Sequence, residues 1–157
     1  MVGAERGARA LLWNKDRSIL LSLGCVVVFA LCLLALDICA YWLAGWFMGR
    51  RAAVFQAYFM ASIYLGSVLG WVFLYQLWGL LNNLRRGELF TAGNVKRMRA
   101  ASWCCFAAAG LCLLSAAYYL PFAFVAVAAA FVGLIVRIVK NAFQQAIAMK
   151  DELDFTV

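Results

Sequence analysis

Four long stretches of apolar side chains most constrain what this sequence can fold into. They cover about residues 19–48, 53–81, 100–120 and 122–139, and charged residues are rare within them. An α-helix needs about 20 apolar residues to cross the hydrocarbon core of a bilayer, which is about 30 Å thick. Since each stretch approaches or exceeds that length, the sequence predicts four membrane-spanning helices.

The composition supports lipid as the solvent of these stretches. Of the 157 residues, 68% are hydrophobic and only 13% are charged, whereas soluble domains carry about 25% charged residues. A transmembrane β-barrel would show segments of about ten residues with alternating polarity. These stretches are apolar on every face, which favours helices. The predicted fold class is therefore all-α, with residues 1–157 forming a single integral membrane four-helix bundle.

The distribution of lysine and arginine indicates how the bundle is oriented. If both ends of the chain and residues 82–99 lie on one side, that side holds twelve of these cations, and the other holds only Arg50 and Arg51. Cytoplasmic segments of membrane proteins carry the excess of positive charge. We therefore expect cytoplasmic N- and C-termini, a cytoplasmic loop at 82–99 and a cytoplasmic tail at 140–157.

The charge and residue types exclude several function classes. The net charge of +7 does not indicate nucleic-acid binding, because the basic residues flank the apolar stretches and form no single stripe. Their expected partners are anionic lipid headgroups at the cytoplasmic face. The chain has no histidine, which removes the usual general base and histidine-ligated metals. No nucleophile–base pair or metal cluster is visible, so we predict no enzyme activity and no cofactor.

The six cysteines lie within the first and third apolar stretches, three in each. A zinc or redox site would require thiolates that converge, usually with Cys-x-x-Cys spacing. That spacing does not occur. We therefore interpret the cysteines as small apolar residues.

Asp37 is the most conspicuous residue within the apolar stretches. A carboxylate in lipid is costly, so it should face the bundle or water. Counted from Ile19 at about 1.5 Å per residue, it lies near the outer surface, where Arg50, Arg51, Tyr41 or interfacial water can meet it. A proton or ion site at Asp37 is the alternative interpretation.

Small residues recur every fourth position in the second apolar stretch, at Ser62, Gly66 and Gly70. This spacing lets helix backbones approach closely. It indicates either packing within the bundle or self-association, and we expect packing within the bundle.

The loop NNLRRGELFTAGNVKRMR, residues 82–99, has the signals of a tight connection between two helices. Gly87 suits the position that ends a helix. Thr91 suits an N-cap whose side chain accepts a hydrogen bond from an early backbone N–H. Phe90 and Val95 then occupy the positions of a hydrophobic staple.

The basic loop and the acidic end of the chain, KDELDFTV, are expected on the same side of the membrane. Exposed ion pairs between them would contribute only about 0–1 kcal/mol each, so a partner or salt could open them. An undocked, solvated tail is the alternative. The candidate interaction residues are Arg85, Arg86, Phe90, Thr91, Asn94, Lys96, Arg97, Arg99, Asp151, Glu152 and Asp154.

The segments LRRGELFTAGNVKRMR and DELDFTV resemble the loop and tail of a bacterial family of small four-span membrane proteins without an assigned function. That family has a glycine followed by Phe-Thr, Asn-Val and basic residues, and ends in acidic residues before Leu-Thr. Here Phe155 stands where leucine is commoner. The resemblance implies a bacterial inner-membrane location. It also implies a cytoplasmic partner, because family members are often encoded beside small helix-turn-helix regulators.

Our leading hypothesis is a non-enzymatic membrane interaction or regulatory protein that binds a cytoplasmic partner through its basic loop and acidic tail. Two alternatives stay open. One is an accessory subunit of a larger integral membrane complex, with other membrane subunits as partners. The other is a small transporter or channel subunit, which needs a polar path that the stretches hardly offer beyond Asp37.

Overall fold

The computed structural model describes residues 2–49, 53–87 and 91–155, and this part of the chain forms helices without strands. The helices are α1 (Val2–Met48), α2 (Ala53–Arg85), α3 (Ala92–Ser115) and α4 (Pro121–Phe155). Each contains a segment that is long and apolar enough to cross a membrane. The all-α prediction with four spanning helices is therefore confirmed.

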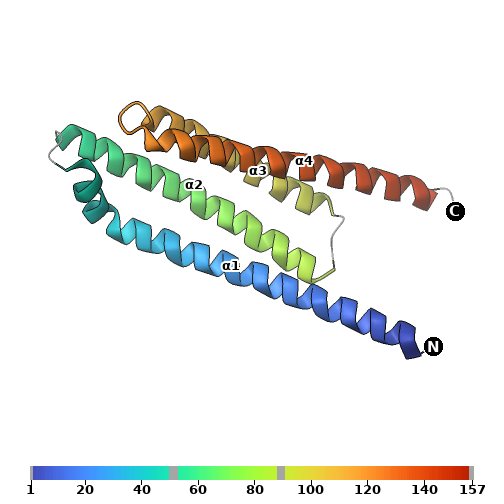
Figure 1. Cartoon of the computed structure of the whole chain (residues 1–157). Coiled ribbons are helices and arrows are strands. Elements are labelled where there is room, and N and C mark those ends of the chain that lie inside the picture. The colour runs from blue at the N-terminus through green and yellow to red at the C-terminus, as the bar shows by residue number, and fades with distance from the viewer. Residues whose placement is uncertain (1, 50–52, 88–90, 156–157) are drawn as a thin grey trace.

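The four helices lie antiparallel to one another in chain order (Figure 1). α1 packs on α2, α2 on α3 and α3 on α4, and no other two helices of the described chain approach as closely. Both termini lie at the same end of the bundle as the connection between α2 and α3 (Figure 1). This placement agrees with the expected grouping of the termini with residues 82–99, and the cytoplasmic location of that end stays a prediction.

Glycines end the first two helices. Gly49 follows α1 with φ of 51°, and Gly87 follows α2 with φ of 80°. A residue with a Cβ is strained in this left-handed conformation, so glycine is the natural residue after the last helical turn. The N–H of Gly87 donates to the carbonyl of Leu84 over 3.1 Å. The predicted role of Gly87 is confirmed.

The turn between α3 and α4 starts earlier than the apolar pattern indicated. α3 ends at Ser115, and residues 116–120 form the turn. Pro121 is then the first residue of α4. Proline is favoured there because its fixed φ suits a helix and its missing N–H would have no helical acceptor. The two helices thus connect through aromatic residues, with Pro121 starting the second one.

The helices α1 and α4 are longer than a membrane requires. α1 has 47 residues and α4 has 35, which correspond to about 70 Å and about 52 Å of helix. A hydrocarbon core is about 30 Å thick. Both helices project beyond the connection between α2 and α3, at the end that holds the termini (Figure 1).

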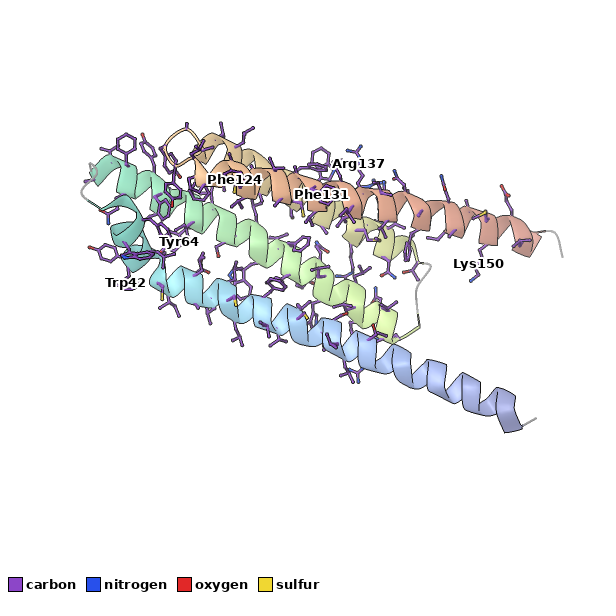
Figure 2. All side chains as sticks on the ribbon, viewed as in Figure 1. Trp42, Tyr64, Phe124, Phe131, Arg137 and Lys150 are labelled. Atoms are coloured by element: carbon purple, nitrogen blue, oxygen red, sulfur yellow. The ribbon has the colours of Figure 1, made fainter. Side chains whose placement is uncertain are left out.

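The enclosed interior centres on α3, which packs between α2 and α4. Its buried side chains are Asn94, Val95, Met98, Ala101, Ser102, Cys105, Ala109 and Ser115. In contrast, large apolar side chains elsewhere point outward, such as Ile38 at 74% exposure and Phe124 at 77%. Figure 2 shows Trp42, also exposed, at the margin of the molecule. Lipid or another membrane protein can cover such surface without the cost that water would impose.

An aromatic cluster closes the bundle at the end opposite the termini. Phe59 of α2 is 4% exposed. Its ring centroid lies 6.2 Å from Phe47 of α1, 5.9 Å from Tyr119 of the turn and 5.7 Å from Phe122 of α4. Such pairs contribute about 0.5–1.5 kcal/mol each beyond the burial of their area. The cluster therefore joins α1 to the start of α4, although these helices separate further along the bundle.

Candidate functional site

The connection between α2 and α3 presents cations to solvent. Arg85 and Arg86 at the end of α2 are exposed, and so are Lys96 and Arg99 near the start of α3. None of the four forms an ion pair within the described chain. Three of them, Arg85, Arg86 and Lys96, make up what we call the turn cations, whereas Arg99 lines a pocket shared with α4. They are available to a negatively charged partner.

Arg97 differs from its neighbours because its side chain lies against α2. Its guanidinium occupies the space that a Cβ at Gly79 would fill. The same side chain lines a small apolar pocket with Leu77, Met98 and Val139. Arg97 therefore reaches across the helix interface with its guanidinium end against α2. Gly79, which makes room for it, was not singled out from the sequence.

Asn94, one of the candidate interaction residues, is also turned inward. It is 2% exposed, and its Oδ1 accepts a hydrogen bond from Asn83 Nδ2 over 2.7 Å. This bond joins the end of α2 to the start of α3 in a largely enclosed position. Asn94 therefore holds the turn together, and a contact between Asn94 and a partner stays a prediction.

Thr91 is the N-cap of α3, as predicted, but its side chain makes no capping hydrogen bond. The helix start is held through the backbone, where the Thr91 carbonyl accepts from the N–H groups of Asn94 at 3.0 Å and Val95 at 3.4 Å. The predicted side-chain cap is therefore wrong. Phe90 lies outside the described residues, so its staple with Val95 stays a prediction.

The acidic end of the chain continues α4 as helix to Phe155. Glu152 is exposed, and the side chains of Asp151 and Asp154 lie outside the described residues. In Figure 1 this end of α4 projects past the connection between α2 and α3. The tail is therefore presented on a helical extension, and its docking on the basic loop stays a prediction.

Asp37 faces the middle of α2. Its Oδ2 accepts a hydrogen bond from Ser67 Oγ over 2.7 Å and one from Trp71 Nε1 over 3.3 Å. Its Oδ1 is buried and has no hydrogen-bond partner in the described chain. These contacts make Asp37 a polar link between α1 and α2.

Ser67 and Trp71, the hydrogen-bond partners of Asp37 in the described chain, were not among those that its depth count indicated. It lies ten residues before Phe47 in α1, about 15 Å from the aromatic end. Arg50 and Arg51 lie outside the described residues, so a contact between them and Asp37, and the place of Asp37 near the outer surface, stay predictions.

Residues 45–157 match the model of a family described as protein of unknown function, DUF2975. The chain belongs to the DUF2975 family. No curated protein and no solved structure matches it. The resemblance seen in the sequence is thus confirmed at the level of an uncharacterised family, and the match includes the turn cations but not Asp37.

Within the matched region, the small residues of α2 all face neighbouring helices of this DUF2975 protein. A Cβ at Gly70 would lie 3.2 Å from Leu33 of α1, and one at Gly66 would lie 3.9 Å from Leu111 of α3. Ser62 Oγ accepts from Ser115 Oγ of α3 over 2.9 Å. The spacing therefore brings α2 close to two different helices of the same chain.

A hydroxyl cluster extends this contact in the DUF2975 bundle. Tyr118 Oη donates to Ser62 Oγ over 2.6 Å, and Ser115 Oγ lies 2.9 Å both from Ser62 Oγ and from the Leu111 carbonyl. The cluster borders an open, mainly apolar groove of about 460 Å³ between α2 and α3. Ser115 and Tyr118 were not predicted, because single hydroxyls in an apolar stretch carry no spacing signal.

Proposed function

We propose that this DUF2975 protein is a non-enzymatic membrane interaction protein that binds a cytoplasmic protein at the end of the bundle that holds both termini. The observation that carries the proposal is the exposure of the turn cations Arg85, Arg86 and Lys96, without ion-pair partners in the described chain. They lie at the end of α2 and the start of α3. The longer helices α1 and α4 project past this connection (Figure 1).

This arrangement supports recognition of an acidic protein surface. Exposed cations attract such a surface at long range, and the attraction falls with salt because the Debye length is about 8 Å at physiological ionic strength. The acidic end of α4, with Asp151, Glu152 and Asp154, supplies a second contact of opposite sign. A small helix-turn-helix regulator is the partner that the resemblance to the bacterial family implies, and the inner membrane is the proposed location.

The test is affinity capture of cytoplasmic proteins by the full chain in detergent. In the turn variant, Arg85→Gln, Arg86→Gln and Lys96→Gln remove the turn cations. The matched pocket variant, Arg99→Gln/Arg137→Gln/Lys140→Gln, removes the same charge elsewhere on α3 and α4. We expect capture by the wild type and the pocket variant, with at least a several-fold loss in the turn variant. Equal capture by all three proteins would refute the proposal.

The same assay tests the acidic tail with a separate variant. Asp151→Asn/Glu152→Gln/Asp154→Asn neutralises the tail and leaves the turn cations in place. If the tail contacts the partner, capture falls. If the tail only docks on the loop, its neutralisation exposes more positive charge, and capture of an acidic partner rises. Unchanged capture would remove the tail from the proposed site.

One observation favours a second function, an accessory subunit of an integral membrane complex. α1 packs closely on α2 alone among the described helices, and side chains such as Phe29 and Ile38 remain exposed on it. A neighbouring membrane protein could cover this face. Crosslinking in native membranes would then recover integral proteins attached to α1, whereas the leading proposal predicts crosslinks from the turn to a soluble protein.

A further inference from the structure

A pocket between α3 and α4 gathers three cations that the proposed function does not use. It has a volume of about 330 Å³ and is lined by Arg99, Ser102, Trp103, Phe106, Arg137 and Lys140. The cations come from two helices, Arg99 from α3 and Arg137 and Lys140 from α4. None of them has an ion-pair partner in the part of the chain that the structure describes.

Close helix packing just below the pocket explains its position. Ser102 Oγ donates to the Gly133 carbonyl over 3.0 Å, and a Cβ at Gly133 would lie 3.0 Å from Cys105 Cβ. Arg99 lies three residues before Ser102, and Arg137 lies four residues after Gly133. Both arginines are therefore about one helical turn from the tightest contact, on the side toward the termini.

The pocket lies at the boundary between apolar and charged sequence. From Arg99 the chain has no charged residue through α3, and on α4 Arg137 is the first charged residue after the turn. Two arginines thus mark the same boundary on neighbouring helices. Trp103, which is 67% exposed, lies one turn from Arg99 toward the apolar region. Indole side chains favour this zone, because the ring contacts the apolar lipid chains while its N–H group reaches the headgroups.

The pocket opens away from the rest of the bundle. Figure 2 shows Arg137 on the side of α4 that faces away from α1 and α2. The opposite side of α4, at Ile135, Val136 and Val139, lines the separate pocket shared with α2 and Arg97. A ligand therefore reaches the cations from the lipid that surrounds α3 and α4, at the level of the headgroups.

We propose that Arg99, Arg137 and Lys140 form a specific site for the phosphate group of an anionic bilayer lipid. Arginine forks bind phosphate oxygens in pairs, and lysine adds a point charge. The volume is at the low end of the range for ligand pockets, about 300–1,000 Å³. The exposed Trp103 and half-buried Phe106 provide apolar surface beside the first atoms of the acyl chains. Lateral access favours a lipid over free phosphate, which shares the same recognition chemistry.

The test is native mass spectrometry of the full chain purified in detergent with dioleoyl phosphatidylglycerol or dioleoyl phosphatidylcholine. The wild type and the turn variant should retain phosphatidylglycerol in preference to phosphatidylcholine. The pocket variant Arg99→Gln/Arg137→Gln/Lys140→Gln should retain about tenfold less phosphatidylglycerol, or less still, because each cation near a headgroup contributes to binding. Arg99→Lys/Arg137→Lys, which keeps the charge, should retain an intermediate amount.

Each result decides the proposal. Equal losses in the turn and pocket variants would show general charge attraction and overturn a specific site, as would full retention by the pocket variant. Displacement of phosphatidylglycerol by millimolar inorganic phosphate would assign the pocket to free phosphate and overturn the lipid assignment. If the pocket variant does not fold, the charge-conserving variant Arg99→Lys/Arg137→Lys still tests the site. A weaker preference of that variant for phosphatidylglycerol would support the site.

Discussion

At the scale of single residues, the close helix contacts depend on positions where a side chain has no room. Gly133 is the clearest of them, because Cys105 Cβ is 3.0 Å from the place of its missing Cβ. Cys105 Cβ is attached directly to the α3 backbone and cannot rotate away. At Gly79, in contrast, the obstructing atoms belong to the mobile end of Arg97. The same residue type therefore has different tolerance at the two positions.

We predict that Gly133→Ala destabilises the bundle, whereas Gly110→Ala does not. Overpacking of a tight contact costs about 1–3 kcal/mol, and separation of α3 from α4 would also weaken the Ser102–Gly133 hydrogen bond. A Cβ at Gly110 meets nothing within 4 Å, and alanine is the better helix former by about 1 kcal/mol. Unfolding of both variants in mixed detergent, followed by circular dichroism, would measure this difference. Equal stability of the two variants would contradict it.

Asn94 provides a second prediction at this scale. Asn94→Ala should destabilise the bundle by about 1–3 kcal/mol, because it leaves the Asn83 amide without its acceptor in an enclosed position. The loss should be smaller when Asn83 has already been replaced by leucine. A double-mutant cycle measured by the same unfolding assay isolates the pair. If Asn94→Ala instead left stability unchanged and abolished partner capture, Asn94 would belong to the interaction surface after all.

At the scale of the helices, the sequence predicted number, type and order well, because a continuous apolar run of about 20 residues has few alternatives to a spanning helix. Gly87 was recognised because a helix stop needs one particular backbone conformation. The contacts between helices were harder to predict from the sequence. The hydrogen bond between Ser67 and Asp37 depends on how two helices are rotated about their axes, and an apolar run does not predict that rotation. The pocket at Arg99 and Arg137 depends on the close packing at Gly133.

The contact between α1 and α2 gives an element-scale prediction. Ser67→Ala removes the 2.7 Å hydrogen bond to Asp37. Within the described chain, the Asp37 carboxyl group then keeps Trp71 as its one hydrogen-bond donor. A hydrogen bond contributes about 0.5–1.5 kcal/mol net to stability, so we expect a loss of that order. In an Asp37→Leu background the same substitution should cost much less. Thermal unfolding of the four proteins measures the coupling, and additive losses would show that the bond is unimportant.

At the scale of the whole molecule, the two ends of the bundle differ in character. One end is closed by the aromatic cluster around Phe59, which joins α1 to α4. At the other end the helices separate, and α1 and α4 extend outward (Figure 1). Exposed cations lie there at the end of α2 and the start of α3. Both proposed sites lie at this second end. Their relevance therefore depends on which side of the membrane that end faces.

We predict that the cationic end is cytoplasmic, because moving it outward would carry twelve cations across the membrane instead of two. Cysteine labelling in intact bacterial cells tests this in a variant whose six native cysteines are replaced by alanine. A membrane-impermeant thiol reagent should label Ala53→Cys, at the closed end, before permeabilisation, and Arg86→Cys only afterwards. The reverse pattern would place the turn cations outside, where a cytoplasmic partner cannot reach them. The lipid site would survive that result, because phosphate groups occupy both membrane surfaces, so the labelling experiment tests partner binding separately from lipid binding.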